Sequence, residues 1–141
     1  MTTAVVQDKL NVLVYSDNRN VRDAVMRGVG RKVGKNGPEI SWMESATGDG
    51  AMLKVREAFD AGERYELLIL DAETKKFGGI GLGKMVRDEI DPDVKFIILI
   101  ARPQDEWLAR VAEPNAVLQY PVDGRALSAA VEQVLAEAVS A

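Results

Sequence analysis

Apolar runs alternate with segments of helical periodicity along most of the chain. Continuous apolar runs of four or five residues are typical of strands that are buried on both faces. Apolar positions three and four residues apart predict amphipathic helices. On these grounds we predict strands at 12–15, 40–43, 67–70, 96–100 and 116–119, and helices at about 19–32, 50–61, 82–89, 105–111 and 124–138.

The regular alternation of strands and helices predicts the fold class. Five strands that each lead into a helix are typical of an α/β domain, in which helices cover both faces of a parallel sheet. With 141 residues, the chain has the length of one domain. We therefore expect a flexible N-terminus over residues 1–9, a single domain over residues 10–138 and no output domain.

The amino-acid composition excludes several kinds of site. The chain has no cysteine and no histidine, which rules out disulfides, thiolate or imidazole metal sites and Ser-His-Asp chemistry. A net charge of −4 argues against a nucleic-acid-binding surface, because such surfaces are usually basic. The first residues lack a signal-peptide pattern, and no apolar run approaches about 18 residues. We therefore expect a cytoplasmic protein without membrane insertion.

A carboxylate stands at the end of the third predicted strand, where Asp71 follows Leu70. Parallel α/β sheets place their chemistry at the carboxyl ends of the strands. The glycine-containing segment 78–85 nearly fits the P-loop pattern, but Met85 lacks the hydroxyl group that would bind Mg²⁺. We therefore take Asp71 as the centre of the candidate site and expect no nucleotide-binding loop.

The chain resembles the receiver domain of bacterial response regulators over roughly residues 10–138. The segments that carry the resemblance are 12–18, 67–71, 97–101 and 119–123, together with Gly79. The resemblance implies a flavodoxin-like (CheY-like) doubly wound sheet with five parallel strands in the order 2-1-3-4-5 and five helices. The chain is longer than the family near 34–38 and shorter between 101 and 120, so we expect a reduced fourth helix. It looks most like small standalone receiver-like proteins of actinobacteria.

The resemblance also implies a role for the residues around Asp71. It makes Asp71 the candidate phosphoacceptor. It also makes Asp17, Asp71 and the backbone carbonyl of Glu73 the ligands of a weak Mg²⁺ site, since Mg²⁺ prefers oxygen ligands. Three further positions depart from the family pattern.

Ser16, Ala101 and Tyr120 stand where the family has an acid, a hydroxyl residue and a lysine. By the same resemblance, the peptide bond between Tyr120 and Pro121 is expected to be cis, which an X–Pro bond allows. Phosphoryl transfer to a carboxylate needs a divalent cation and stabilisation of negative charge. Ser16, in place of an acid, weakens the binding of the cation. Tyr120, in place of a lysine, removes a positive charge that would stabilise the negative charge.

These substitutions predict an atypical receiver, or pseudo-receiver, that is not an enzyme and requires no cofactor. It would regulate other proteins by direct contact. One alternative is a single-domain response regulator that is phosphorylated on Asp71 with Mg²⁺, and another is a small accessory subunit of a larger complex. Lys75 or Lys76 would replace the missing lysine if either folded over the acids, but we expect both to be solvated.

The expected partner is a protein: a kinase, a transcription factor or a larger complex. The resemblance points to the face made by the fourth helix, the fifth strand and the fifth helix as the contact surface. Trp107 lies in this fourth helix, where it is either a partner anchor or a core residue. We expect no nucleic-acid partner, and either a monomer or a homodimer.

Overall fold

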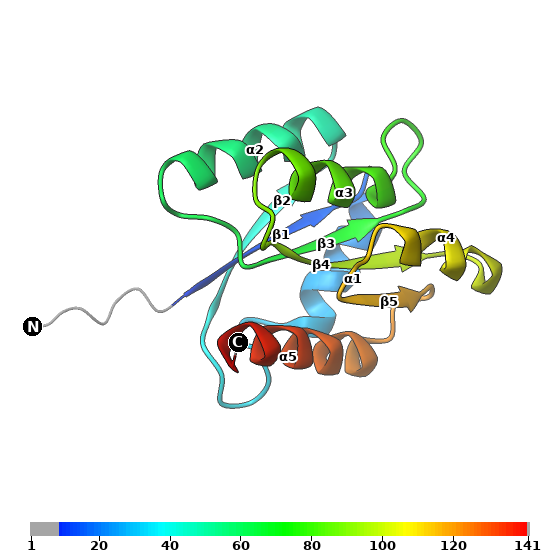
Figure 1. Ribbon diagram of the computed structural model, residues 1–141. Coiled ribbons are helices and arrows are strands. Elements are labelled where there is room, and N and C mark those ends of the chain that lie inside the picture. The colour runs from blue at the N-terminus through cyan, green and yellow to red at the C-terminus, as the bar shows by residue number, and fades with distance from the viewer. Residues whose placement is uncertain (1–8, 141) are drawn as a thin grey trace, which may run out of the picture.

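The computed structural model describes residues 9–140, with side chains up to Ala136. Most of the predicted flexible N-terminus, residues 1–8, lies outside the described residues. Five parallel strands form one sheet in the order β2-β1-β3-β4-β5 (Figure 1). Their bounds are Leu10–Tyr15 for β1, Ile40–Ser45 for β2, Leu67–Asp71 for β3, Lys95–Ile100 for β4 and Ala116–Gln119 for β5. The predicted flavodoxin-like sheet is confirmed.

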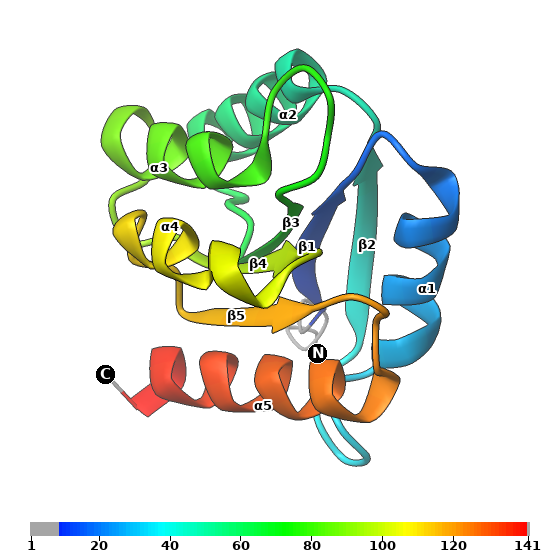
Figure 2. The ribbon, with the colours of Figure 1, turned by 90° about the vertical axis from the view of Figure 1, so that its right-hand side faces the viewer.

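Helices cover both faces of this sheet (Figure 2). One face is covered by α1 (Arg19–Val29) and α5 (Gly124–Ser140), and the other by α2 (Gly48–Asp60), α3 (Gly79–Glu89) and α4 (Glu106–Val111). Successive side chains of a strand point to opposite faces. In β1, Val12 and Val14 therefore pack with α1 and α5, whereas Leu13 and Tyr15 pack with α2 and α3. The carboxyl ends of all five strands lie at one edge of the sheet, which is where the candidate site forms.

The glycines that follow β3 belong to helix α3, which begins at Gly79 and not at residue 82 as predicted. A Cβ atom on Gly79 would lie 2.7 Å from the backbone oxygen of Asp71. A Cβ atom on Gly83 would lie 2.5 Å from a ring carbon of Phe96. These glycines let α3 approach the sheet closely, so the segment that resembles a P-loop is a packing surface.

Helix α1 ends before Gly30, earlier than the predicted end at residue 32. Gly30 has a φ of 89°, a positive value that favours glycine, and its N–H donates to the Met26 carbonyl at the end of the helix. The chain then folds back on itself, with an antiparallel bridge between Lys32 and Glu39 and a hydrogen bond of 3.0 Å from the Val33 N–H to the Pro38 carbonyl. This excursion contains the segment that makes the chain longer than the family.

Helix α4 is short, as predicted, and has six residues after the 3-10 turn Pro103–Asp105. Its buried residue is Ala109. Trp107 is 70% exposed, and Leu108 and Val111 beside it are also exposed. The interpretation of Trp107 as a core residue is therefore wrong, and α4 presents an apolar surface instead.

Candidate functional site

Asp71 ends β3 and is only 3% exposed. Both oxygens of its carboxylate accept hydrogen bonds from the protein. The Ser16 hydroxyl donates to Oδ2 at 2.6 Å, and the backbone N–H of Glu73 donates to Oδ1 at 2.8 Å. A carboxylate that is buried in this way remains satisfied because charge-assisted hydrogen bonds replace its lost hydration.

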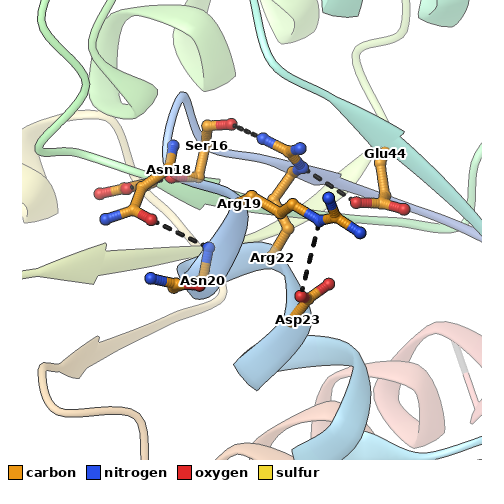
Figure 3. A network of polar contacts seen from close by, with 8 residues as sticks. Ser16, Asn18, Arg19, Asn20, Arg22, Asp23 and Glu44 are labelled. Carbon is orange, nitrogen blue, oxygen red and sulfur yellow. Dashed lines mark hydrogen bonds and ion pairs between the residues drawn. The ribbon is translucent and has the colours of Figure 1, made fainter.

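Ser16 is completely buried at the end of β1, and its surroundings hold it in place. Its hydroxyl oxygen accepts from the Asn18 N–H at 3.0 Å while the hydroxyl donates to Asp71. The Arg22 guanidinium donates to the Ser16 carbonyl at 2.8 Å and also binds Glu44 at 2.9 Å (Figure 3). Arg22 thus links the end of β1 to the end of β2 and holds the backbone of Ser16 in place.

The other two acids of the predicted site each bind a backbone N–H from a neighbouring loop. Oδ2 of Asp17 accepts from the Lys75 N–H at 3.0 Å. Oε2 of Glu73 accepts from the Ala101 N–H at 3.1 Å. The ammonium groups of Lys75 and Lys76 form no ion pair with the acids of residues 9–136, and both side chains are exposed. Neither Lys75 nor Lys76 therefore supplies, toward the acids of residues 9–136, the positive charge of the lysine that the family has at the position of Tyr120.

Two tyrosines border the site. The hydroxyl of Tyr15 contacts Thr74 at 3.3 Å and donates to the carbonyl of Phe77, so this ring is tied to the loop after β3. The hydroxyl of Tyr120 is buried and forms no hydrogen bond of good geometry with the described residues, although it lies within interaction distance of the Asp71 carboxylate. Burial raises the pKa of Tyr120, and the carboxylate of Asp71 close by raises it further. Tyr120 thus fills the lysine position with a neutral hydroxyl, and its peptide bond to Pro121 is cis.

Two of the three predicted magnesium ligands, the carboxylates of Asp71 and Asp17, already accept hydrogen bonds from the protein. Asp71 is buried and accepts at both oxygens, and Oδ2 of Asp17 accepts from the Lys75 N–H. In the described part of the chain, no three acidic residues are grouped so that they could hold a metal ion. Mg²⁺ demands near-octahedral oxygen coordination, so at Asp71 it would compete with the hydrogen bonds from Ser16 and Glu73.

Two contacts of this site were not predicted from the sequence. Ser16 was read as a lost acid, yet its hydroxyl donates to Asp71, 55 residues away in the chain. Glu73 was considered for its backbone carbonyl, yet its carboxylate holds the N–H of Ala101 at the end of β4. A signal was present for Ser16, because a hydroxyl and an acid at neighbouring strand ends are natural hydrogen-bonding partners. The sequence alone gave no direction for either side chain.

Sequence comparison places the chain among known proteins. No family model matches it. Two uncharacterised response regulatory proteins, from the H37Rv and CDC 1551 strains of Mycobacterium tuberculosis, are each 35% identical to the chain over 126 residues. The matched region covers 89% of this chain and 91% of each relative.

Solved structures share the fold at lower identity. The signal receiver domain of an HD domain-containing protein from Pseudomonas fluorescens Pf-5 has a TM-score of 0.76 at 17% identity, over 99% of this chain and 96% of that one. A CheY-like receiver domain protein from Methanospirillum hungatei JF-1 has a TM-score of 0.70 at 19% identity, over 92% and 95%. The BeF3-activated receiver domain of DrrB has a TM-score of 0.68 at 16% identity, over 91% and 98%.

Among residues 9–140, no helix is both long enough and apolar enough to cross a bilayer.

Proposed function

The chain belongs to the response regulator family, and we propose that it acts there as a pseudo-receiver, which regulates other proteins by contact without phosphorylation-dependent switching. The observation that carries the proposal is the state of Asp71. Its carboxylate is 3% exposed, and Ser16 and Glu73 donate to its two oxygens. A charge-assisted hydrogen bond stabilises the negative charge of the attacking oxygen and so lowers its reactivity as a nucleophile.

The neighbours of Asp71 support the same proposal. A phosphoryl group there would meet the neutral hydroxyl of Tyr120 in place of an ammonium group and the methyl group of Ala101 in place of a hydroxyl. A hydrogen bond to a charged group contributes about 1.5–3 kcal/mol, which corresponds to about one to two decades in a rate or equilibrium constant. Losing such an interaction weakens both the transfer and the switch that would follow it.

No cofactor and no enzymatic activity are part of this function. The carboxylates of Asp17 and Glu73 already bind the N–H groups of Lys75 and Ala101. In this proposal they hold the loops around Asp71 in one arrangement, which is what the magnesium and phosphoryl groups do transiently in a switching receiver. We place the protein in the cytoplasm, where the partners of response regulators act.

The partner surface in this proposal is the apolar face of α4, together with β5 and α5. Trp107, Leu108 and Val111 are 70%, 46% and 62% exposed, and large exposed apolar groups gathered on one surface mark interaction sites. The charges at the two ends of α4 are already matched, because Arg110 binds Glu106 at 3.2 Å within the helix. A neutral apolar patch of this kind suits a protein partner, such as a kinase, an effector or a subunit of a larger assembly, and suits nucleic acid poorly.

Labelling with a small phosphodonor tests the proposal. The protein is treated with acetyl phosphate and Mg²⁺, and the intact mass is measured beside that of Asp71→Asn. We expect no phosphate-sized increase that depends on Asp71. A matched triple variant, Ser16→Asp with Ala101→Thr and Tyr120→Lys, restores the family's side chains and serves as the positive control. Robust labelling of the unmodified protein that disappears in Asp71→Asn would favour the phosphorylatable regulator.

A further inference from the structure

A groove opens at the edge of the sheet opposite the candidate site, beside the N-terminal end of β1. Its volume is about 720 Å³, within the range of about 300–1,000 Å³ that is usual for ligand pockets. One wall is the excursion between α1 and β2, and the other is the last described part of α5. The lining residues are Leu10, residues 33–38, Glu66, Glu132, Leu135 and Ala136.

The groove exists because the excursion stands against α5. Gly34 has a φ of 64° and approaches Glu132 so closely that a Cβ atom would collide with its carboxylate. Figure 1 shows the same arrangement, with the loop between α1 and β2 running beside α5. The longer loop therefore creates a concave surface, and its floor and walls include the apolar side chains of Leu10, Val33 and Leu135.

We propose that this groove is an intramolecular docking site for the N-terminal residues 1–8 of the same chain. The segment ends at residue 8, and Leu10, two residues further along the chain, lines the groove. The segment therefore joins the fold at the groove. The segment carries three consecutive apolar residues, Ala4, Val5 and Val6. Val6 is four residues from Leu10, and four residues span at most about 14 Å, which keeps the apolar residues within reach.

The covalent link makes a weak interaction sufficient. A short flexible connection gives an effective concentration of millimolar order, so even millimolar affinity would leave a large fraction of molecules docked. The groove is lined by Lys35 as well as by Glu66 and Glu132, so it is the apolar side chains of the lining that match the apolar residues of the segment. The inference does not depend on the state of Asp71, because the groove is at the other end of the sheet.

A spin label on the segment tests the proposal in the full chain. The chain has no cysteine, so Thr3→Cys gives a single labelling site without further substitutions. We expect the label to broaden the amide NMR signals of residues 33–37 and 132–136. The variant Val5→Asp with Val6→Asp, carrying the same label, should lose most of this broadening. The matched control Thr2→Asp with Gln7→Asp adds the same two charges at polar positions and should keep it.

Two results would overturn the proposal. Equal broadening in the Val5→Asp/Val6→Asp variant would mean that the segment is merely tethered near the groove. A spin-labelled copy can also be mixed with an isotope-labelled copy that carries no spin label. Broadening of the signals of the second copy would assign the groove to a second molecule. The substitutions lie before the first strand, so circular dichroism should show an unchanged fold in every variant.

Discussion

At the scale of single residues, the hydrogen bond from Ser16 to Asp71 is the contact that most affects the candidate site. The bond is 2.6 Å long, joins two buried side chains and has a carboxylate as its acceptor, so it is charge-assisted and shielded from water. Ser16→Ala removes the hydroxyl donor and leaves Oδ2 of the buried Asp71 carboxylate without this hydrogen bond. We expect the free energy of unfolding at neutral pH to fall by about 1.5–3 kcal/mol, measured by urea denaturation.

The matched control is Ser41→Ala, at an exposed position of the edge strand β2. Surface substitutions of this kind usually change stability by less than about 0.5 kcal/mol. A Ser16→Ala variant as stable as Ser41→Ala would show that the Ser16 hydroxyl does not support the Asp71 carboxylate.

Tyr120 gives a second prediction at this scale, through its buried hydroxyl. The folded state raises the pKa of Tyr120 above its ordinary value of about 10. A raised pKa favours the protonated, neutral form in the folded state. The contribution of Tyr120 to the free energy of unfolding is therefore fully present below about pH 10, and it is lost as the pH rises further. Tyr120→Phe should lessen this alkaline loss, when urea denaturation at pH 7 is compared with that at pH 10.5.

The same variant should also be as stable as the unmodified protein at pH 7, or more stable by about 1 kcal/mol. It removes a buried hydroxyl that forms no hydrogen bond of good geometry with the described residues and lies close to the Asp71 carboxylate, and such a group costs free energy to bury. Tyr15→Phe is the contrasting variant, because it removes a hydroxyl that contacts Thr74 and Phe77, and it should destabilise the protein. If Tyr120→Phe were the more damaging of the two, the hydroxyl of Tyr120 would have a partner that supports the fold.

At the scale of elements, the glycines of α3 distinguish a helix packed on the sheet from a flexible loop. Gly83 faces the ring of Phe96, whereas Gly81 has open space, with its nearest contact 4.0 Å from a built Cβ atom. Gly83→Ala should destabilise the protein by about 1–3 kcal/mol through overpacking. Gly81→Ala should stabilise it by about 0.5–1 kcal/mol, because alanine is the better helix former. Thermal unfolding of the pair checks both signs, and equal effects would contradict a packed α3.

Helix α4 carries the prediction about the partner. Trp107→Ala should abolish capture of the partner in a pull-down from the native cell, because a large exposed aromatic group is a typical interface anchor. The matched control is Leu53→Ala on α2, since Leu53 is also exposed, at 57%, but lies away from α4. Equal capture by the two variants would remove α4 from the contact surface.

Elements were predicted well where one local signal decides them. The run Phe96 to Ile100 and the spacing of Leu127, Val131 and Leu135 each gave the correct strand or helix. The errors lay at boundaries that tertiary packing decides. The glycines at the start of α3 have low helix propensity, yet they are helical because the helix must approach β3 closely.

At the scale of the whole molecule, the alternation of strands and helices predicted a parallel sheet with right-handed crossovers, and the resemblance to receiver domains supplied the strand order. The position of Asp71 at a strand end followed from the same pattern. The contacts of the Asp71 carboxylate did not follow from the pattern. They depend on side-chain directions in loops that meet only in the folded chain. Ser16, Glu73 and Tyr120 were identified as site positions, but their contacts needed the structure.

The central claim is that this receiver domain does not switch, and NMR with a phosphoryl analogue tests it most directly. Beryllofluoride and Mg²⁺ are added to the ¹⁵N-labelled protein, and the amide signals of Glu73 and Ala101 are followed together with the indole signal of Trp107. These groups report on Asp71, on the end of β4 and on the α4 face. We predict that none of the three signals changes. Saturable changes at Glu73 and Ala101 that extend to Trp107 would show a working phosphoryl switch and would contradict the account.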